Sequence, residues 1–469
     1  MTNHFHTKHK FMKCWMSIMS VCFLLMPVDA THAELKCANV TRCDSRRQCV
    51  EVCRRGSLQL SEWYKFAWKT QNDLAKSASP CTAQLLGTHN SAITLADGYG
   101  GENDRYTQLF EELHLSPSFV RTHNQLLSLT DQLNMGARML ELDVHWVWGD
   151  LRIAHCGGFK SRVLTGIVQA LQSIVDKDGV EIDWDLATVG CFPSLSAIPA
   201  QDQRTFVDAL GELADWLHAN PEEFLLLYLD NESDLSKWDK AGLVVEAVEH
   251  LLGQWLFRPC DLLSVGGQWP TIQEIVSQRK RVVVFSRTNY NSTMNSTMFP
   301  KTSCQWHEPG ADTLEKTCTA KGYVTGYDLV RPVGNDIRYG PLNGAGQMGP
   351  NKHPLHGPEL QAWSRCGGMP APDLLTPEIA ENAIWGWRSG HMATDARSVV
   401  IQSAEDGRWI SMDNTTMKLA CRSEAGWVLA LTRPMSTTWS LPQNGKENAD
   451  LWDAALAAGV KDGVRLNAP

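Results

Sequence analysis

Short apolar runs that end in polar residues recur along the first two thirds of the chain and constrain its fold more than any other feature. Five such runs are Gln84–Leu86, Met139–Val144, Leu151–Ala154, Phe224–Leu229 and Arg281–Phe285. Amphipathic helical patterns occupy Ser128–Gly136 and Asp202–Asn220. Alternating strands and helices predict an α/β fold with a parallel sheet, and polar groups gathered after the strands predict a (β/α)8 barrel of the TIM type. A doubly wound open sheet is the alternative, but no glycine-rich phosphate loop follows the first strand.

The last part of the chain has a different pattern. After a helix-like stretch at Thr376–Ile384, short strands and turns replace the longer elements. This change predicts a barrel over residues 81–384 and a small β-rich domain over residues 385–469. Trp385-Gly386-Trp387 and Ala420-Cys421-Arg422 faintly resemble motifs of C-type lectin-like modules, which implies glycan binding by this domain. A structural cap on the barrel is the alternative.

The first thirty residues have the pattern of a secretory signal peptide. Three lysines precede the mostly apolar stretch Cys14–Met26, and Ala30 and Ala33 offer cleavage positions. The stretch is too short to span a bilayer, and no later segment is apolar over a sufficient length. We therefore expect residues 1–30 to be removed and the protein to be secreted to the extracellular space. A membrane anchor is the alternative.

Cysteine usage fits an oxidising compartment. Of fourteen cysteines, all but two follow the signal, so disulfides are expected. Residues 31–80 form a cysteine-rich segment whose spacing would also suit zinc, although export favours disulfides. Cys304 and Cys318 could close a loop within the stretch from about Thr288 to Pro354, which is rich in Asn, Gly, Pro, Thr and Ser. Sequons that predict a glycoprotein lie at Asn39, Asn231, Asn291, Asn295 and Asn414.

The net charge of the chain is negative. The formal net charge is −9, and removal of residues 1–30, which carry three lysines and one aspartate, would make it −11. Bulk charge therefore favours neither nucleic-acid binding nor adhesion to anionic membranes. A bound cation would suit such a protein better.

The strand predicted around residue 141 places two carboxylates at the barrel mouth. Alternate residues of a strand point to opposite faces, so Glu141, Asp143 and His145 share one face. Two buried like charges are costly without a cation. Pairing with Arg138 or Arg152 is the alternative to a metal site.

Oxygen atoms from several strand ends would form this metal site. The expected ligands are Asn90, Glu141, Asp143 and Asp230. One amide and three carboxylates suit a hard cation, and the set fits Ca²⁺ slightly better than Mg²⁺.

Two histidines follow predicted strands and could act as acid and base. His89 and His155 follow the first and third strands, where paired imidazoles beside a cation could catalyse phosphoryl transfer. His123, in a second Thr-His-Asn triplet, precedes a helix and is not expected to take part. His145 shares the face of the carboxylates and could bind substrate. Arg287 follows a strand end and could touch phosphate, although a surface position without function is the alternative.

Five motifs support a resemblance to a known family. In chain order they are Gly87-Thr88-His89-Asn90-Ser91, Thr130-Asp131-Gln132-Leu133, Gly136-Ala137-Arg138-Met139-Leu140-Glu141-Leu142-Asp143, Ala154-His155-Cys156-Gly157 and Leu227-Tyr228-Leu229-Asp230-Asn231. Together they resemble the catalytic X domain of phosphatidylinositol-specific phospholipase C, especially in secreted proteins that carry this domain. The resemblance covers roughly residues 84–286.

The resemblance implies roles for single residues. His89 would be the general base and His155 the general acid, while Asn90, Glu141 and Asp143 match ligands of the calcium-dependent branch. Asp143 stands where the metal-free bacterial branch looks to have an arginine, which favours a metal here. The fourth ligand position is usually Glu in the family, so Asp230 is a departure.

The resemblance also implies a reaction. His89 would take a proton from a hydroxyl next to the phosphodiester of a phosphatidylinositol-type lipid, and that oxygen would attack phosphorus. His155 would protonate the departing diacylglycerol, leaving a cyclic phosphate. Trp146 and Trp148 would follow the metal-bearing strand and contact a membrane surface, or else pack in the ordinary way. A glycerophosphodiester or sphingomyelin-type phosphodiesterase and a non-catalytic secreted binding protein are the alternatives.

Overall fold

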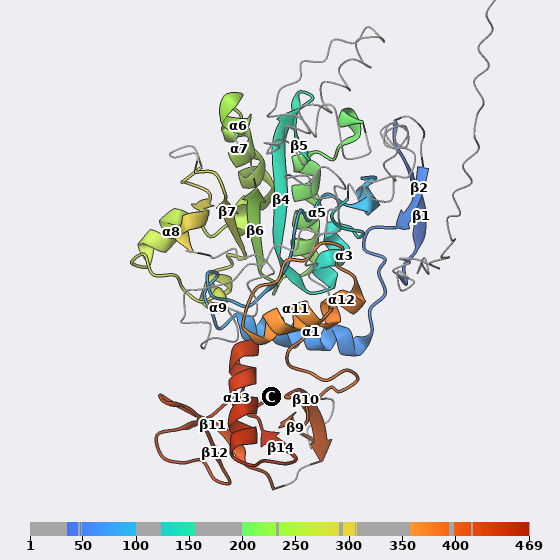
Figure 1. Cartoon of the computed structure of the whole chain (residues 1–469). Helices are drawn as coiled ribbons and strands as arrows, with labels where there is room; N and C mark the ends of the chain where they lie inside the picture. Colours follow the sequence, from blue (N-terminus) through green and yellow to red (C-terminus); the bar gives the residue numbers. More distant parts are fainter. Residues whose placement is uncertain are drawn as a thin grey trace, which may run out of the picture. The chain divides into compact units, whose positions relative to one another are not determined.

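A parallel sheet with the strand order β3-β4-β6-β7-β8 forms the centre of the fold, and Figure 1 shows β4, β6 and β7 side by side. In the computed structural model the strands are β3 (Leu86–Thr88), β4 (Ala137–Val147), β6 (Leu225–Asp230), β7 (Val282–Ser286) and β8 (Phe299–Pro300). β4, β6 and β7 overlap the apolar runs of the sequence over most of their length, whereas β3 begins at Leu86, the last residue of the predicted run Gln84–Leu86. The predicted mixed α/β fold with a parallel sheet is confirmed. Closure of the sheet into a barrel is not shown by the described strands and stays a prediction.

Structural statements apply to the part of the chain whose placement is described. It comprises residues 35–45, 47, 49–99, 123–154, 199–230, 234–289, 294–304, 306, 357–393, 398–413 and 416–468. Among the helices within these ranges, none is both long and apolar enough to cross a membrane. The predicted signal peptide lies outside them.

The third predicted strand belongs to a hairpin. β5 (Asp150–Ile153) pairs antiparallel with β4. The two residues between the strands, Trp148 and Gly149, have φ angles of 55° and 73°, the left-handed conformation that both central residues of a type I′ turn adopt. A parallel strand would need a crossover of about a dozen residues or more. Leu151–Ala154 is therefore not the parallel strand that the alternating pattern implied.

Helices follow the strands along the chain. They are α3 (Leu129–Asn134), α5 (Phe206–Ala219), α6 (Asp234–Lys237), α7 (Ala241–Leu252), α8 (Pro259–Ser264) and α9 (Ile272–Ser277). α3 and α5 match the two helical patterns in the sequence. α5 begins after Thr205, whose side chain accepts a hydrogen bond from the backbone N–H of Asp208.

The two faces of β4 meet different surroundings. Leu140 and Leu142 are fully buried in a cluster with side chains of α5 and α7. Met139 belongs to a separate cluster on the other face of the strand. Because side chains alternate along a strand, Glu141 and Asp143 lie on the side of Met139. The helix-covered face therefore supplies the packing, and the opposite face carries the carboxylates.

A disulfide-bonded hairpin precedes the sheet. β1 (Asn39–Cys43) and β2 (Cys49–Cys53) pair antiparallel, and disulfides join Cys37 to Cys53 and Cys43 to Cys49. These bonds confirm the prediction of disulfides in the cysteine-rich segment. The alternative, a zinc site formed by the same cysteines, is wrong.

A different pairing corrects the expectation for Cys304. Its disulfide partner is Cys81, 223 residues earlier in the chain, and not Cys318. The bond joins the segment before β3 to the segment after β8, two places that only the fold brings together. Cys366 is disulfide-bonded as well, whereas Cys260 and Cys421 are free.

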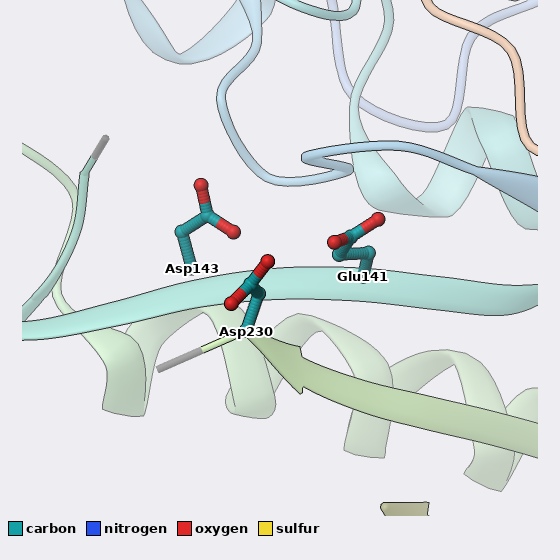
Figure 2. A group of neighbouring side chains, drawn as sticks. All are labelled: Glu141, Asp143 and Asp230. Carbon is teal, nitrogen blue, oxygen red and sulfur yellow. The ribbon is translucent and has the colours of Figure 1, made fainter. Parts of the chain in front are cut away.

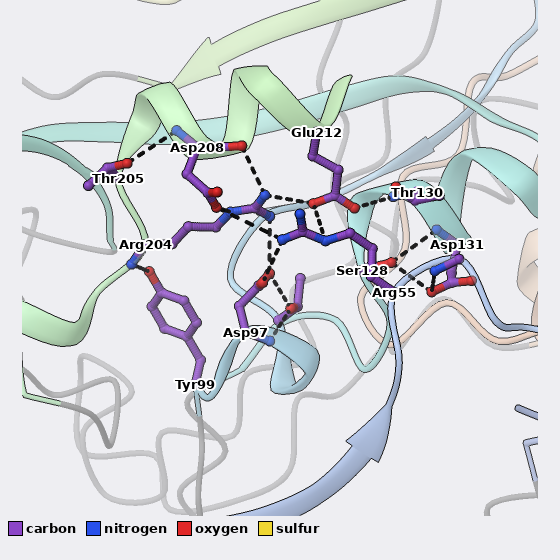
Figure 3. Close-up of polar contacts among 12 residues, drawn as sticks. Arg55, Asp97, Tyr99, Ser128, Thr130, Asp131, Arg204, Thr205, Asp208 and Glu212 are labelled. Atoms are coloured by element: carbon purple, nitrogen blue, oxygen red, sulfur yellow. Dashed lines mark hydrogen bonds and ion pairs between the residues drawn. The ribbon is translucent and has the colours of Figure 1, made fainter. Parts of the chain in front are cut away.

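A network of ion pairs around Glu212 of α5 includes the buried Arg204 and the part-exposed Arg55 (Figure 3). Arg204 contacts Glu212 at 2.6 Å and Asp97 at 3.1 Å, and Arg55, which follows β2, contacts Glu212 at 3.3 Å. Burial alone would lower the pKa of Arg204, but the nearby carboxylates more than offset it and raise that pKa. A buried network of this kind loses stability when one partner is removed, because the other charges stay buried.

A second sheet forms the C-terminal region, in the order β10-β9-β14-β11-β12 with β13 beside β11. Its elements are β9 (Ser398–Ser403), β10 (Trp409–Asp413), β11 (Leu419–Ser423), β12 (Gly426–Ala430), β13 (Thr438–Trp439), α13 (Gly445–Ala457) and β14 (Gly463–Arg465). The region is β-rich, as expected, but α13 was not expected from the sequence.

Helices from both ends of the chain share a core with this second sheet. They are α1 (Glu62–Ala75), α11 (Gly357–Arg365) and α12 (Pro377–Glu381). Trp68 of α1 lies in one cluster with Trp387, Trp409 and Leu451. The boundaries predicted at residues 80 and 384 stay predictions.

Candidate metal and acid–base site

Three carboxylates meet at the carboxyl ends of β4 and β6. Glu141 and Asp143 lie on one side of β4, and Asp230 is the last residue of β6 (Figure 2). Asp143 and Asp230 are register partners on these neighbouring parallel strands. Carboxylate oxygens of all three residues lie within 4.8 Å of one another. Glu141 and Asp143 are buried, whereas the Asp230 side chain is 20% exposed.

Asn90 lies beside these carboxylates. With its amide nitrogen turned toward Asp143, it can donate to both carboxylate oxygens at 3.1 Å. Asn90 has a φ of 42°, in the left-handed region that Asn tolerates better than most residues. Residues held in such conformations often lie at functional sites. The structure thus brings together all four predicted ligands.

The donor set fits a hard divalent cation. One amide and three carboxylates offer oxygen only, and oxygens that share a Ca²⁺ ion at about 2.3–2.6 Å are separated by up to about 5 Å. The alternative pairing of the carboxylates with Arg138 or Arg152 is wrong. Arg138 binds Glu223 and nearby backbone carbonyls, and Arg152 binds backbone carbonyls at residues 201 and 203.

Arg287 contacts the proposed ligand set directly. Its Nη1 lies 2.8 Å and 2.7 Å from the two carboxylate oxygens of Asp230. The Arg287 side chain is 47% exposed, so water screens this pair. Arg287 was predicted to bind substrate, and it does lie at the site. In the structure, however, it binds Asp230. Any cation bound by Asp230 would have to compete with this guanidinium.

His89 forms a pair with an acid that the sequence did not reveal. Its Nδ1 lies 2.8 Å from Oδ1 of Asp373, and both side chains are buried. Asn124 donates to the same Asp373 oxygen at 3.0 Å. An acid on Nδ1 fixes the tautomer in which Nε2 is the basic nitrogen.

The position of Asp373 follows from an irregular strand pairing. The backbone N–H groups of Gly87 and His89 donate to the carbonyls of Pro370 and Pro372. Prolines cannot donate to a ladder, so the sequence 370–372 gives no strand pattern. His89 and Asp373 are 284 residues apart in the chain, and no local signal could have connected them.

Two further predicted residues are His145 and His155. His145 is buried on β4 and shares the strand side of Asp143. His155 lies outside the described residues. Ala154, the residue before it, donates its backbone N–H to the backbone carbonyl of Asp143 at 3.3 Å.

Comparison with known proteins points to one family. Residues 195–320 match the family model described as PI-PLC X, a range that includes Asp230 and Arg287 but not His89. The uncharacterized protein MT2135 of Mycobacterium tuberculosis is 25% identical over 447 residues, 85% of this chain and 79% of that protein. PI-PLC X domain-containing protein 1 of Arthroderma benhamiae is 24% identical over 210 residues, 44% of this chain and 54% of that protein.

Solved structures of bacterial enzymes also match. Phosphatidylinositol-specific phospholipase C from Listeria monocytogenes is 12% identical, with a TM-score of 0.37 over 67% of this chain and 97% of the enzyme. The Staphylococcus aureus enzyme is 11% identical, with a TM-score of 0.39 over 69% of this chain and 99% of the enzyme. The family model and the Arthroderma relative carry the same X-domain name that the five motifs predicted. By its sequence, the chain is similar to the PI-PLC X-domain family over residues 195–320.

Proposed function

We propose that this protein is a secreted, metal-dependent phosphodiesterase that cleaves phosphatidylinositol-type lipids to a cyclic phosphate and diacylglycerol. One observation carries the proposal: the His89–Asp373 pair lies next to the carboxylate cluster. Asn90 connects the two, because it follows His89 in the chain and lies beside Asp143. A base, its orienting acid and a set of hard-cation ligands are the groups that internal phosphoryl transfer needs.

The chemistry divides between two histidines. His89, with Asp373 on Nδ1, takes the proton of a substrate hydroxyl at Nε2, and the hydroxyl oxygen forms a new bond to phosphorus. The bond between phosphorus and the diacylglycerol oxygen breaks, and His155 gives that oxygen a proton. Asn90, Glu141, Asp143 and Asp230 would hold Ca²⁺, or Mg²⁺, which when bound supplies positive charge for the phosphate oxygens.

Surface features support contact with a lipid interface. Trp148, in the turn between β4 and β5, is 53% exposed, and Trp238, after α6, is 43% exposed. Exposed indoles near the carboxyl ends of the strands suit transient insertion among headgroups. The disulfides in the described chain support export to an oxidising compartment.

The contact between Arg287 and Asp230 favours a second candidate, a secreted binding protein without turnover. A guanidinium that keeps Asp230 occupied would weaken the metal site that catalysis needs. Such a protein would bind the headgroup and leave it intact.

Substrate assays separate these functions. The purified protein is incubated with phosphatidylinositol, sphingomyelin and glycerophosphodiesters, each with Ca²⁺, Mg²⁺ or chelator. We expect a cyclic inositol phosphate only with metal, and a loss of at least about 10²-fold in His89→Ala and His155→Ala. His250→Ala, an exposed histidine on α7, is the matched control. Turnover of sphingomyelin or a glycerophosphodiester alone would support the other phosphodiesterases, and headgroup binding without product would support the binding protein.

A further inference from the structure

A groove of about 470 Å³ lies between α1, α11 and α12 and the second sheet with α13. This volume falls within the roughly 300–1,000 Å³ of small-molecule sites. A second, smaller cavity shares Arg365, Asn382, Arg408 and Trp452 with the groove, so the two are continuous.

The groove is separate from the carboxylate site. None of its lining residues is a candidate ligand or acid–base residue. α1, which contributes Trp63 to the groove, lies against the start of β4: a Cβ on Gly136 would approach the Trp68 ring to 2.5 Å. Asp143 lies near the other end of that strand.

The charged side chains that line the groove differ in how they are paired. Arg388 is neutralised, since it binds both oxygens of Asp406 at 2.7 and 3.0 Å. In the described part of the chain, Arg365, Arg408 and Glu381 form no ion pair. Burial lowers the pKa of Arg408, and the charge of Asp406 offsets this only in part, because the like charge of Arg365 lowers the pKa as well. Arg408 donates from Nη1 to the carbonyl of Ile384, and a guanidinium with five N–H groups still has donors for a ligand.

A fixed aromatic ring lies among these groups. The indole N–H of Trp452 donates to the carbonyl of Ala404 at 2.9 Å, which fixes the ring. The Arg365 guanidinium lies 4.7 Å from the centre of that ring. Gln361 and Asn382 add two amides to the same lining. The guanidinium thus covers one face of the indole and presents its N–H groups to the groove, next to amides that both donate and accept.

We propose that this groove binds a neutral saccharide. Adjacent hydroxyls of a sugar donate and accept at once, so they match the guanidinium, carboxylate and amide groups of the lining. Three arginines and four carboxylates line the groove, so its field favours neither a strong anion nor a free cation. The proposal does not rest on the phosphodiesterase activity.

Ligand-observed NMR and calorimetry test the site on the full mature chain. The probes are methyl α-D-mannopyranoside, methyl β-D-galactopyranoside, N-acetylglucosamine and cellobiose, with glucuronic acid as the charged comparison. We expect at least one neutral sugar to bind, with affinity reduced about tenfold in Arg365→Gln and in Glu381→Gln, because each loses a charged hydrogen-bonding group. Arg433→Gln, an exposed arginine outside the groove, should bind like the parent.

Three results would overturn the proposal: no neutral sugar binds at millimolar concentration, only glucuronic acid binds, or both groove variants bind like the parent. Equal unfolding temperatures of the variants exclude a folding defect, which we do not expect because neither residue has an ion pair to lose. Sugar binding should persist in His89→Ala, which separates this site from the phosphodiesterase site.

Discussion

The ion pair between Arg287 and Asp230 predicts that this arginine opposes metal binding. Both oxygens of Asp230 are within 2.8 Å of Arg287 Nη1, and the same carboxylate lies in the cluster with Glu141 and Asp143. A divalent cation must share or displace the guanidinium and is also repelled by it. Arg287→Gln removes the charge and keeps a side chain of similar reach.

The expected gain in affinity follows from the exposure of the pair. Arg287 is 47% exposed and Asp230 20%, so the pair contributes about 0.2–1 kcal/mol, as exposed pairs do. Loss of this ion pair alone would raise the Ca²⁺ affinity up to about fivefold. Removal of the repulsion between the arginine and the cation brings the expected gain to about tenfold. Because water and salt screen the pair, the gain should shrink as ionic strength rises.

Calorimetric titration of Ca²⁺ into the parent and Arg287→Gln proteins measures this gain without reference to activity. Arg54→Gln, an exposed arginine on the hairpin, controls for the change in net charge. Asp230→Asn should weaken Ca²⁺ binding and abolish the effect of the arginine substitution in the double variant.

Two results would refute the reasoning. If Arg287→Gln leaves the Ca²⁺ affinity unchanged while Asp230→Asn lowers it, then Arg287 does not compete with the cation. If Arg287→Gln lowers the affinity, then the arginine supports the site rather than opposing it.

Two further predictions concern single pairs. Asp373→Asn should lower kcat by about 10²–10⁴-fold with little change in KM, because an amide favours the wrong tautomer of His89; steady-state kinetics would contradict this if KM alone changed. For Glu223, burial alone would raise the pKa, but Arg138 more than offsets it and holds it below the ordinary value. The pair of Glu223 with Arg138 therefore stabilises the fold fully above the ordinary glutamate pKa. This stabilisation is lost as the pH falls through the lowered pKa of Glu223. Denaturant unfolding from pH 7 to pH 3 should show a smaller loss of stability in Glu223→Gln than in the parent, and equal losses would argue against the pair.

The sequence by itself determined the central strands and half of the site. Buried apolar runs predicted β3, β4, β6 and β7, because hydrophobic periodicity is local and strong. Strand parity placed Glu141 and Asp143 on one side of β4 for the same reason, since alternation is a property of the backbone. The family motifs pointed to Asn90 and Asp230, which the fold brings beside them.

Only the tertiary structure decided which distant groups meet. Asp373 reaches His89 through a proline-containing edge that has no strand pattern, and Cys81 pairs with Cys304 across 223 residues. The contact of Arg287 with Asp230 depends on the adjacency of β6 and β7. These contacts depend on how separate elements pack, and local sequence patterns carry no information about that packing.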